Sequence, residues 1–482
     1  MSQELPPADP RATRPAGADG VALERAAWSA LGIVLGARHR RAFLAASAPP
    51  PAHRSRLRRP RTRQHGGVTH TAAEVQGWLN ARADEMAALL EQLVAVNTEN
   101  PPGRGLGRCG RVLKDAMKRL SLSPEVIELA PTGELEDPCI VRGSVGDGPR
   151  TIYFHGHFDV VPAQSAAQFR PKRNDGRIIG RGTADMKGGL VSMIYGAVAA
   201  RELRLLEGRR IVFHLVCDEE TGSQAGSGQL REAGMLDPDA FAMLTAEPTG
   251  GVIWHACRGA ITLRVKTIGR EAHVGYVHQG VNAFEHMIRI AEPLTALSRD
   301  LLEERTGFPV EGDAAGGSML VVGGQAGAGA GFNSVPGSAW FSVDRRFNPE
   351  EDLQEEMARL IGMINESAEA IGAQVEVDVL QEQPSGSTEA THPAAQALAE
   401  CVAAVDGTDP SFQMCPGVLD TRWYSQLGIP ALAYGGGRLD ISHGPDEYIE
   451  EAAMCRCAAA YALFAMCRAP GTGLARPCAG HP

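Results

Sequence analysis

No segment of the chain is apolar over enough residues to cross a membrane. The apolar run AAWSALGIVLGA at residues 26–37 has only twelve residues, whereas a membrane-spanning helix needs about 20. Arginines follow this run instead of preceding it, which is not typical of a secretory signal. We therefore expect a protein that does not span a membrane.

Cysteine pairs with the CxxC spacing of many metal and redox sites are also missing. The ten cysteines are scattered, and the two closest, Cys455 and Cys457, have one residue between them. That spacing is poor for a metal site. We expect reduced thiols and a cytoplasmic protein.

An excess of positive charge is absent as well. The chain has 47 Lys and Arg against 57 Asp and Glu, and its net charge of −10 argues against a general nucleic-acid binder. Residues 1–70 are the exception, because they hold twelve Arg, no Lys and four acidic residues among many Pro and Ala. This composition predicts a disordered extension, or a reading frame extended upstream of the true start. A basic arm or targeting segment is the alternative.

From residue 71 onward, helical and strand patterns alternate. The stretch WLNARADEMAALLEQLVAVNT (78–98) has helical apolar spacing, and the short apolar runs TIYFHGHF and RIVFHLVCD lie between further helical segments. Strands that alternate with helices predict an α/β domain, with a central mixed, mostly parallel sheet flanked by helices.

Residues 259–378 follow a different pattern. Three segments, GAITLRVKTIGREAH, SAWFSVDRRF and AQVEVDVLQ, alternate apolar and polar residues and are separated by two long helical stretches. They predict an inserted α+β domain with antiparallel strands. The first domain would then comprise 71–258 and 379–469, with 470–482 as a frayed tail. The segment GGQAGAGAGF (323–332) lacks the spacing of a phosphate-binding loop, so we expect it to be a flexible loop.

Histidines and acidic residues follow several predicted strands. They are His157, Asp159, Asp185, Asp218, Glu219, Glu220, Glu247 and His443. Loops beyond the carboxyl ends of parallel strands form one crevice, so these side chains are expected to meet. Clustered carboxylates repel one another, and two divalent metal ions would balance them. Imidazole and carboxylate ligands suit Zn²⁺, and two-metal sites are typical of hydrolases. Each motif alone also fits a polar turn, so the prediction depends on their joint occurrence.

Seven segments in this order resemble the M20 family of metallopeptidases and deacylases. They are HGHFDVVP, GRGTADMKGG, DEETGS, AEPT, REAHVGYVHQGVNAF, FNSVPGSAWFSVDRRFNPEE and SHGPDE. The resemblance spans about residues 85–470 and implies a zinc-peptidase-like catalytic domain, with the inserted domain as a lid and dimerisation domain. It implies hydrolysis of an N-acyl amino acid or a related amide. A dipeptidase or carboxypeptidase is the alternative, and a non-catalytic metal-binding relative is a remote one.

The resemblance also implies the metal ligands. His157 and Glu247 match the ligands of one zinc ion, Glu220 and His443 match those of a second, and Asp185 matches the aspartate that bridges them. Co²⁺ and Mn²⁺ accept the same ligand types. The expected cofactor is therefore a pair of Zn²⁺ ions, with Co²⁺ or Mn²⁺ as substitutes.

Two neighbours of these ligands match catalytic positions of the family. Asp159 lies two residues after His157 and would hold its other ring nitrogen. Glu219 precedes Glu220 and resembles the general base, which takes a proton from water and passes it to the leaving nitrogen. His155 matches a family position that does not bind metal.

Three residues of the inserted domain match positions that approach the substrate. His273 matches a histidine that reaches the partner subunit's active site and stabilises the oxyanion, which implies a homodimer. Asn333 and Arg346 match substrate contacts, and a guanidinium suits a substrate carboxylate. His278 is an alternative to His273. The spacer VGYVHQ and the loop FRPKRNDGR depart from the family pattern, so substrate choice can differ.

Overall fold

The computed structural model describes residues 71–130, 135–206, 208–312 and 316–467. The predicted disordered extension at 1–70 and the frayed tail at 470–482 lie outside them. No helix in the described ranges combines the length and the apolar character needed to cross a membrane.

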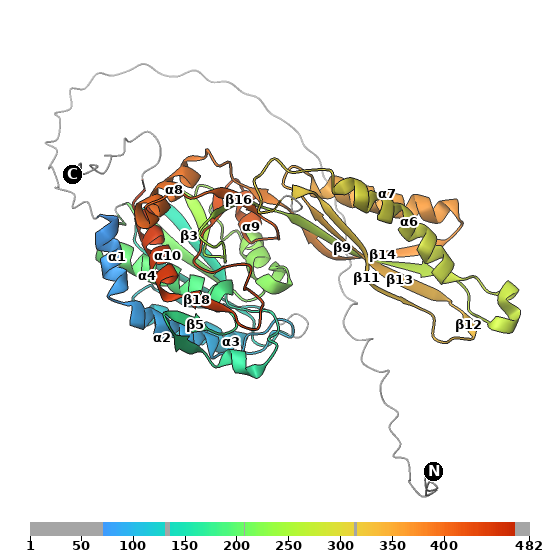
Figure 1. Ribbon diagram of the computed structural model, residues 1–482, viewed down its shortest axis with the longest axis horizontal. Helices are drawn as coiled ribbons and strands as arrows, with labels where there is room; N and C mark the ends of the chain where they lie inside the picture. Colours follow the sequence, from blue (N-terminus) through green and yellow to red (C-terminus); the bar gives the residue numbers. More distant parts are fainter. Residues whose placement is uncertain (1–70, 131–134, 207, 313–315, 468–482) are drawn as a thin grey trace, which may run out of the picture. The chain divides into compact units, whose positions relative to one another are not determined.

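Helices and strands alternate through most of the described chain (Figure 1). The helices are α1 (Ala72–Asn80), α2 (Ala83–Val94), α3 (Leu106–Arg119), α4 (Gly188–Glu202), α5 (Gln229–Glu232), α6 (Ala283–Leu301), α7 (Leu353–Ala370), α8 (Pro393–Asp406), α9 (Thr421–Ser425) and α10 (Glu451–Phe464). The strands that precede residue 258 are β1 (Glu125–Glu128), β2 (Cys139–Val145), β3 (Arg150–His157), β4 (Lys172–Asn174), β5 (Arg177–Ile179), β6 (Arg209–Val216), β7 (Ala242–Thr245) and β8 (Ile253–Cys257). The later strands are β9 (Gly259–Ile268), β10 (Ala272–His273), β11 (Met319–Ala328), β12 (Ser334–Val335), β13 (Ser338–Phe347), β14 (Gln374–Gln383), β15 (Gly386–Ser387), β16 (Phe412–Cys415), β17 (Ala431–Ala433) and β18 (Tyr448–Glu450).

A mixed sheet of nine strands forms the larger part of the described fold. Its order is β1-β2-β6-β3-β7-β17-β8-β15, with β16 beside β8. The central strands β6, β3, β7 and β17 pair in parallel, whereas β1, β2 and β15 join antiparallel. The predicted α/β class is confirmed, and the parallel part is the centre of the sheet.

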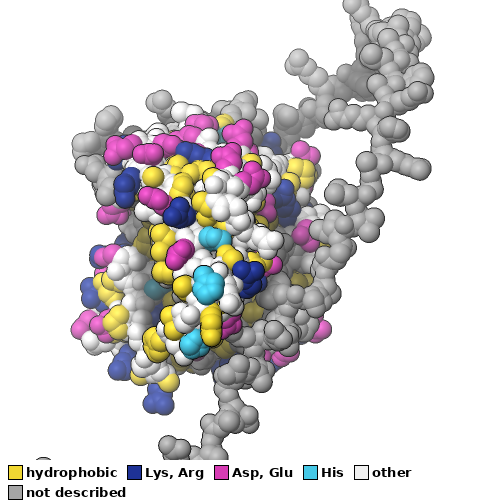
Figure 2. All heavy atoms as spheres, turned by 90° about the vertical axis from the view of Figure 1, so that its right-hand side faces the viewer, with side chains coloured by type: hydrophobic (Ala, Val, Ile, Leu, Met, Phe, Trp, Pro, Cys, Tyr) yellow, Lys and Arg dark blue, Asp and Glu magenta, His cyan; other side chains and the backbone are white. Residues whose placement is uncertain are grey.

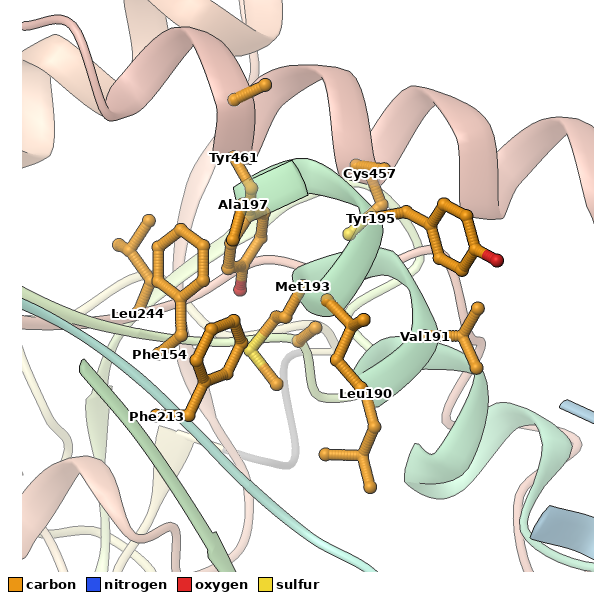
Figure 3. Packing of buried hydrophobic residues seen from close by; sticks show 14 of the residues in the cluster. Phe154, Leu190, Val191, Met193, Tyr195, Ala197, Phe213, Leu244, Cys457 and Tyr461 are labelled. Carbon is orange, nitrogen blue, oxygen red and sulfur yellow. The ribbon is translucent and has the colours of Figure 1, made fainter. Parts of the chain in front are cut away.

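Alternate residues of β3 face two different helical layers. Phe154 packs with α4 and α10, whereas Tyr153 packs with residues of α5 and α9 on the other face. Figure 3 shows side chains of α4 around Phe154, whose ring centroid lies 4.9 Å from that of Tyr461. Each large apolar side chain buried here contributes about 1.5–3 kcal/mol. Because α4 starts three residues after Asp185, this packing anchors the turn that carries Asp185.

A second, four-stranded antiparallel sheet contains strands β11-β13-β9-β14, and we call it the small sheet. Alternate residues of these strands, among them Leu263 and Phe341, pack with α6 and α7 in one apolar cluster that includes Leu360 of α7. Figure 1 shows the two helices beside these strands. This is the expected arrangement of antiparallel strands with two helices. The chain passes between the two sheets from β8 to β9 and from β14 to β15.

The prediction of a flexible loop at 323–332 is wrong for its first half. Gly323–Ala328 belongs to β11, and Gly327 pairs with Trp340 of β13. A Cβ atom on Gly327 would lie 2.8 Å from the Trp340 indole nitrogen, so a larger residue there would displace the indole ring. Pairing with the neighbouring strand therefore overrides the low strand propensity of glycine.

The helical stretch at 78–98 is also interrupted. It contains the end of α1 and all of α2, and the break falls at Ala81–Arg82. The Arg82 guanidinium donates to the Trp78 carbonyl at 3.0 Å and lies 3.6 Å from the Trp78 ring centroid. These contacts satisfy one of the carbonyl groups left open at the end of α1.

Candidate metal centre

His157, the last residue of β3, has a buried imidazole with carboxylates on one side. Its Nε2 atom lies 3.2 Å from Asp185 Oδ1 and 3.8 Å from Glu247 Oε2. Its Nδ1 atom lies 3.1 Å from the backbone oxygen of Asp159 and 3.4 Å from the Asp159 carboxylate. The Asp159 side chain thus lies beside the ring nitrogen that it was expected to hold, and the backbone oxygen of Asp159 lies slightly closer to it.

Asp185 lies between two histidines, one on each carboxylate oxygen. Its Oδ2 atom is 3.2 Å from His443 Nε2, and the same His443 atom is 3.4 Å from Glu220 Oε1. One ligand atom each from His157, Asp185 and Glu220 lies within 4.8 Å of the others. We call His157, Asp185, Glu220, Glu247 and His443 the carboxylate–histidine cluster.

The backbone of His443 has a left-handed conformation, with φ of +63°. A non-glycine residue in this region costs of the order of 1 kcal/mol and persists only where its surroundings hold it. The His443 carbonyl accepts hydrogen bonds from Gln164 Nε2 at 2.9 Å and from Arg181 Nη2 at 3.1 Å. These two side chains stabilise the conformation that turns His443 toward Asp185.

A buried ion pair that the sequence did not reveal supports the same region. Arg181 Nη1 donates to Glu447 Oε2 at 2.6 Å, and both side chains are almost fully buried. Glu447 Oε1 accepts the backbone N–H groups of Ala184 and Asp185 at 2.9 and 3.2 Å. Both charged residues lie inside quoted motifs, GRGTADMKGG and SHGPDE, but their pairing across 266 residues has no signal in the sequence.

The Asp159 side chain holds the segment that carries Glu219 and Glu220. Its Oδ1 and Oδ2 atoms accept the backbone N–H groups of Glu219 and Glu220 at 3.2 and 3.1 Å. Asn100 Nδ2 donates to Oδ2 at 3.0 Å. Asn100 was not expected near the site, because it lies in a proline-rich turn far from the strand-end motifs.

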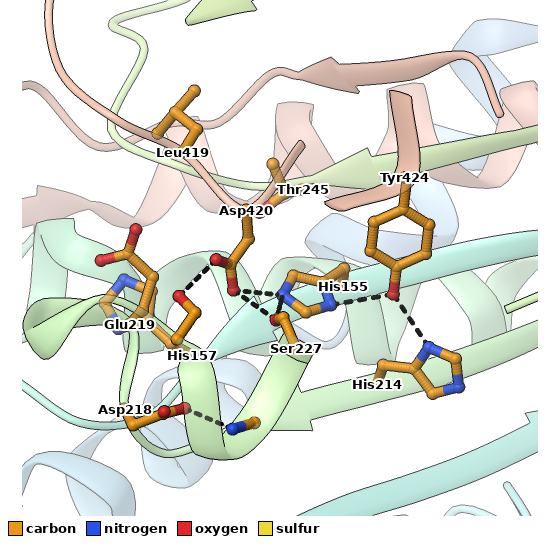
Figure 4. Close-up of polar contacts among 12 residues, drawn as sticks. His155, His157, His214, Asp218, Glu219, Ser227, Thr245, Leu419, Asp420 and Tyr424 are labelled. Carbon is orange, nitrogen blue, oxygen red and sulfur yellow. Dashed lines mark hydrogen bonds and ion pairs between the residues drawn. The ribbon is translucent and has the colours of Figure 1, made fainter. Parts of the chain in front are cut away.

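His155 belongs to a separate polar network next to the carboxylate–histidine cluster (Figure 4). Its Nε2 atom lies 2.8 Å from Asp420 Oδ2, and its Nδ1 atom lies 3.0 Å from the Tyr424 hydroxyl. Ser227 donates to the same Asp420 oxygen at 2.7 Å. Both ring nitrogens of His155 are thus engaged away from Asp185 and Glu247.

Burial and mutual repulsion make the carboxylates of the site costly to ionise. Burial raises the pKa of Glu220 and of Glu247, and it raises the pKa of Glu219 well above its usual range. The Asp185 carboxyl is also buried, but hydrogen bonds from His157 and His443 hold its pKa well below the usual range. The two histidines can carry less positive charge than the four carboxylates carry negative charge when all are ionised.

The donor set fits a divalent metal ion. Glu220 Oε1 is buried and forms no well-aligned hydrogen bond within the described ranges, and its near neighbour is the imidazole of His443 at 3.4 Å. A buried carboxylate oxygen beside an imidazole is suited to bind a cation together with that imidazole. Imidazole nitrogen and carboxylate oxygen are ligands that Zn²⁺ accepts.

The three residues expected from the inserted domain lie elsewhere. His273, on β10, is exposed and accepts the Gly275 N–H at 3.1 Å, and Asn333 is exposed before β12. Arg346, on β13, donates to Asp344 at 2.8 and 3.1 Å. Within the described ranges, no hydrogen bond or ion pair joins them to the carboxylate–histidine cluster. Arg345, the preceding residue, faces the opposite side of β13, where it pairs with Glu356.

Two curated relatives match most of the chain. An N-formyl-4-amino-5-aminomethyl-2-methylpyrimidine deformylase of Halalkalibacterium halodurans is 23% identical over 406 residues, which cover 78% of this chain and 92% of the relative. A succinyl-diaminopimelate desuccinylase of Methylobacterium radiotolerans is 27% identical over 406 residues, which cover 81% of this chain and 98% of the relative.

Solved structures share the fold. An M20 family metallo-carboxypeptidase of Sulfolobus solfataricus superposes with a TM-score of 0.66 and 16% identity, over 80% of this chain and 99% of that chain. A Bacillus subtilis protein described as a dinuclear metal-binding peptidase of the M20 family has a TM-score of 0.58 and 16% identity, over 80% and 98%. Residues 153–466 match the model of peptidase family M20/M25/M40. The chain therefore belongs to peptidase family M20/M25/M40 and is a metal-dependent hydrolase that acts on amide bonds.

Proposed function

We propose that this chain is a two-zinc deacylase that removes the acyl group from an N-acyl amino acid or a related amide. The observation that carries the proposal is the position of Asp185, whose two oxygens face His157 and His443 separately. The two curated relatives are named a deformylase and a desuccinylase, which favours removal of a small acyl group over peptide cleavage.

Each half of the carboxylate–histidine cluster would hold one ion. His157 and Glu247 would bind the first, Glu220 and His443 the second, and Asp185 would bind both. When bound, the two ions would lower the pKa of a water molecule and polarise the amide carbonyl. Zn²⁺ suits this donor set, and Co²⁺ or Mn²⁺ accepts the same ligands.

Glu219 is the proposed general base. Its neighbour Glu220 is a proposed ligand, and Asp159 holds the backbone of both. Burial raises the pKa of Glu219 well above its usual range, with the nearby charges of Asp420 and Glu247 in the same direction and that of His157 in the opposite one. Glu219 would take a proton from water and return it to the nitrogen of the leaving amine.

We further propose that the protein acts as a homodimer. Several large apolar side chains are exposed around His273, and Val274, Tyr276 and Val277 are 55, 58 and 62% exposed. Figure 2 shows hydrophobic and histidine side chains together on one face of the molecule. Exposed apolar patches with polar rims are typical of protein interfaces. A second copy would bring its His273 to the amide oxygen and stabilise the oxyanion.

Substrate contacts of the proposed enzyme include Asn333 and Arg346. Arg346 is bonded to Asp344 on the same strand, so a substrate carboxylate would replace or share that contact. A guanidinium binds a carboxylate through bidentate hydrogen bonds, which favours a substrate with a free carboxylate.

The direct test is hydrolysis of a panel by the zinc-loaded protein. The panel contains N-formyl, N-acetyl, N-succinyl and N-carbamoyl amino acids together with dipeptides. We expect kcat/KM for at least one acyl amino acid to exceed that for every dipeptide by about tenfold or more. A preference for dipeptides would favour the metallo-exopeptidase alternative, and no hydrolysis of any compound would contradict the proposal.

A further inference from the structure

The segment at residues 218–228, which we call the base loop, follows β6 and carries Glu219 near its start. Asp218 closes the loop on itself, because its carboxylate accepts the N–H groups of Ala225 and Gly226 at 2.7 and 2.9 Å. Figure 4 shows Asp218 and Glu219 beside the Asp420 network. The two ends of the loop are thus tied together, and the middle of the loop is held by other parts of the chain.

Two buried side chains converge on the carbonyl oxygen of Gly222. Gln383 Nε2 donates to it at 2.9 Å and Arg422 Nη2 at 3.0 Å. Gln383 Oε1 in turn accepts from Arg422 Nε at 3.0 Å, so the three groups form a closed triangle of hydrogen bonds. Gln383 is 4% exposed and Arg422 is 1% exposed, so water competes little for these bonds.

Gly222 connects this triangle to Glu219. The Gly222 N–H donates to the Glu219 carbonyl at 2.9 Å. Gly222 has φ of +106°, and a Cβ atom there would lie 3.1 Å from Gln383 Nε2. Both the backbone conformation and the approach of Gln383 therefore favour glycine at this position.

Gln383 comes from the small sheet, whereas Arg422 lies on α9 and Asp420 precedes that helix. Gln383 is the last residue of β14 and pairs with Ala260 of β9. Arg422 also donates to Asp420 Oδ1 at 3.2 Å, and Asp420 accepts the hydroxyl of Ser227. The base loop is therefore held both by α9 and by β14. Gln383, at the end of β14, is the contact from the small sheet.

We propose that Gln383 is a positioning residue whose hydrogen bond to the Gly222 carbonyl makes the position of Glu219 depend on the end of β14. The inference rests on the proposed role of Glu219 as the base. A change in the orientation of the small sheet would be transmitted through β14 to the base loop. The reacting groups tolerate little displacement, so loss of this bond lowers the rate of the chemical step.

The sharpest variant is Gln383→Glu. It keeps the side-chain length and the acceptor for Arg422, but it replaces the donor that faces the Gly222 carbonyl with a second acceptor. We expect kcat to fall roughly 10- to 100-fold while KM stays within about twofold. Metal content and melting temperature should match those of the wild type. The matched control is Gln354→Glu, because Gln354 is an exposed glutamine that bonds Glu382 at 2.9 Å.

A second measurement does not depend on any substrate. Hydrogen–deuterium exchange of the full chain should show faster exchange of the amides at 218–228 in Gln383→Glu than in the wild type or the control. Unchanged exchange there, or kcat within about twofold of the wild type, would overturn the proposal. If Gln383→Glu does not fold, Gln383→Met removes the donor without adding charge and is judged by the same outcomes. If the wild type hydrolyses none of the panel, the proposed function fails, while the exchange result still decides the role of Gln383.

Discussion

Asp159 accepts the backbone N–H of Glu219 at 3.2 Å, so the orientation of the proposed base depends on a carboxylate that follows a different strand. Its second oxygen accepts the N–H of Glu220 at 3.1 Å. A single side chain therefore aligns two consecutive glutamates with different proposed roles. The same carboxylate lies 3.4 Å from His157 Nδ1, the ring nitrogen that Asp159 was expected to hold.

Asp159→Asn leaves one acceptor oxygen for these two backbone donors. We expect kcat to fall about 10- to 100-fold while the protein retains its metal. Mutation of residues that orient metal ligands has effects of this size. Steady-state kinetics with metal analysis tests the expectation. Asp115→Asn, at an exposed position of α3, is the control. A kcat for Asp159→Asn equal to that of the control would show that this alignment does not matter.

Glu447→Gln breaks the buried pair with Arg181. Removing one partner of a buried ion pair leaves the other charge without compensation, so we expect a loss of roughly 3–5 kcal/mol in the free energy of unfolding. Denaturant unfolding measures it. Glu376→Gln is the matched control, because Glu376 and Lys266 form an exposed pair at 2.7 Å, and its loss should stay below about 1 kcal/mol. Equal losses in the two variants would contradict the structural role of Glu447.

Metal uptake should release protons near neutral pH. Hydrogen bonds with Asp185 and Glu220 raise the pKa of His443 to about 10 in the metal-free protein. The surrounding carboxylates also outweigh burial and raise the pKa of His157. The imidazole of His443 is then protonated at pH 7 and must lose a proton to bind metal, so affinity increases with pH, roughly tenfold per pH unit for each proton released.

Titration of the chelator-treated protein with Zn²⁺, in buffers of different ionisation enthalpy, counts these protons. His443→Ala should release fewer protons and bind more weakly than the wild type. Metal binding without net proton release at pH 7 would contradict the protonated state of His443 in the metal-free protein.

His273 is predicted to act on the site of the partner subunit. His273→Ala should lower kcat about 10²–10³-fold. Mixing it with the inactive variant Glu219→Gln should restore activity, because each mixed dimer then contains one site with an intact base and an intact histidine. Random exchange of equal amounts gives about a quarter of the wild-type activity. No recovery, with exchange of subunits shown by mass spectrometry, would contradict action across the dimer.

The strand-end pattern could be read from the sequence, and the structure does bring His157, Asp185, Glu220, Glu247 and His443 together. The prediction succeeded because the carboxyl ends of parallel strands lie on one edge of a sheet, independently of the details of packing. The supporting contacts could not be predicted in this way. The bond of Gln383 to Gly222 and that of His155 to Asp420 join residues 161 and 265 positions apart. Such pairings follow from tertiary packing, which local periodicity does not encode.

The fold shows the same contrast. Alternating segments such as SAWFSVDRRF predicted β13, because one face of that strand is buried and the other is not. The glycine-rich part of β11 carried no such alternation, and only its pairing with β13 makes it a strand.

The central claim is that Glu219 moves the proton while Glu220 binds metal, although the two are neighbours. Glu219→Gln and Glu220→Gln make the same chemical change at adjacent positions, so zinc content and turnover measured on both separate the two roles. Glu219→Gln should keep the zinc content of the wild type and lose turnover by about 10³-fold or more, whereas Glu220→Gln should lose zinc. Near-normal turnover in zinc-loaded Glu219→Gln would contradict the account.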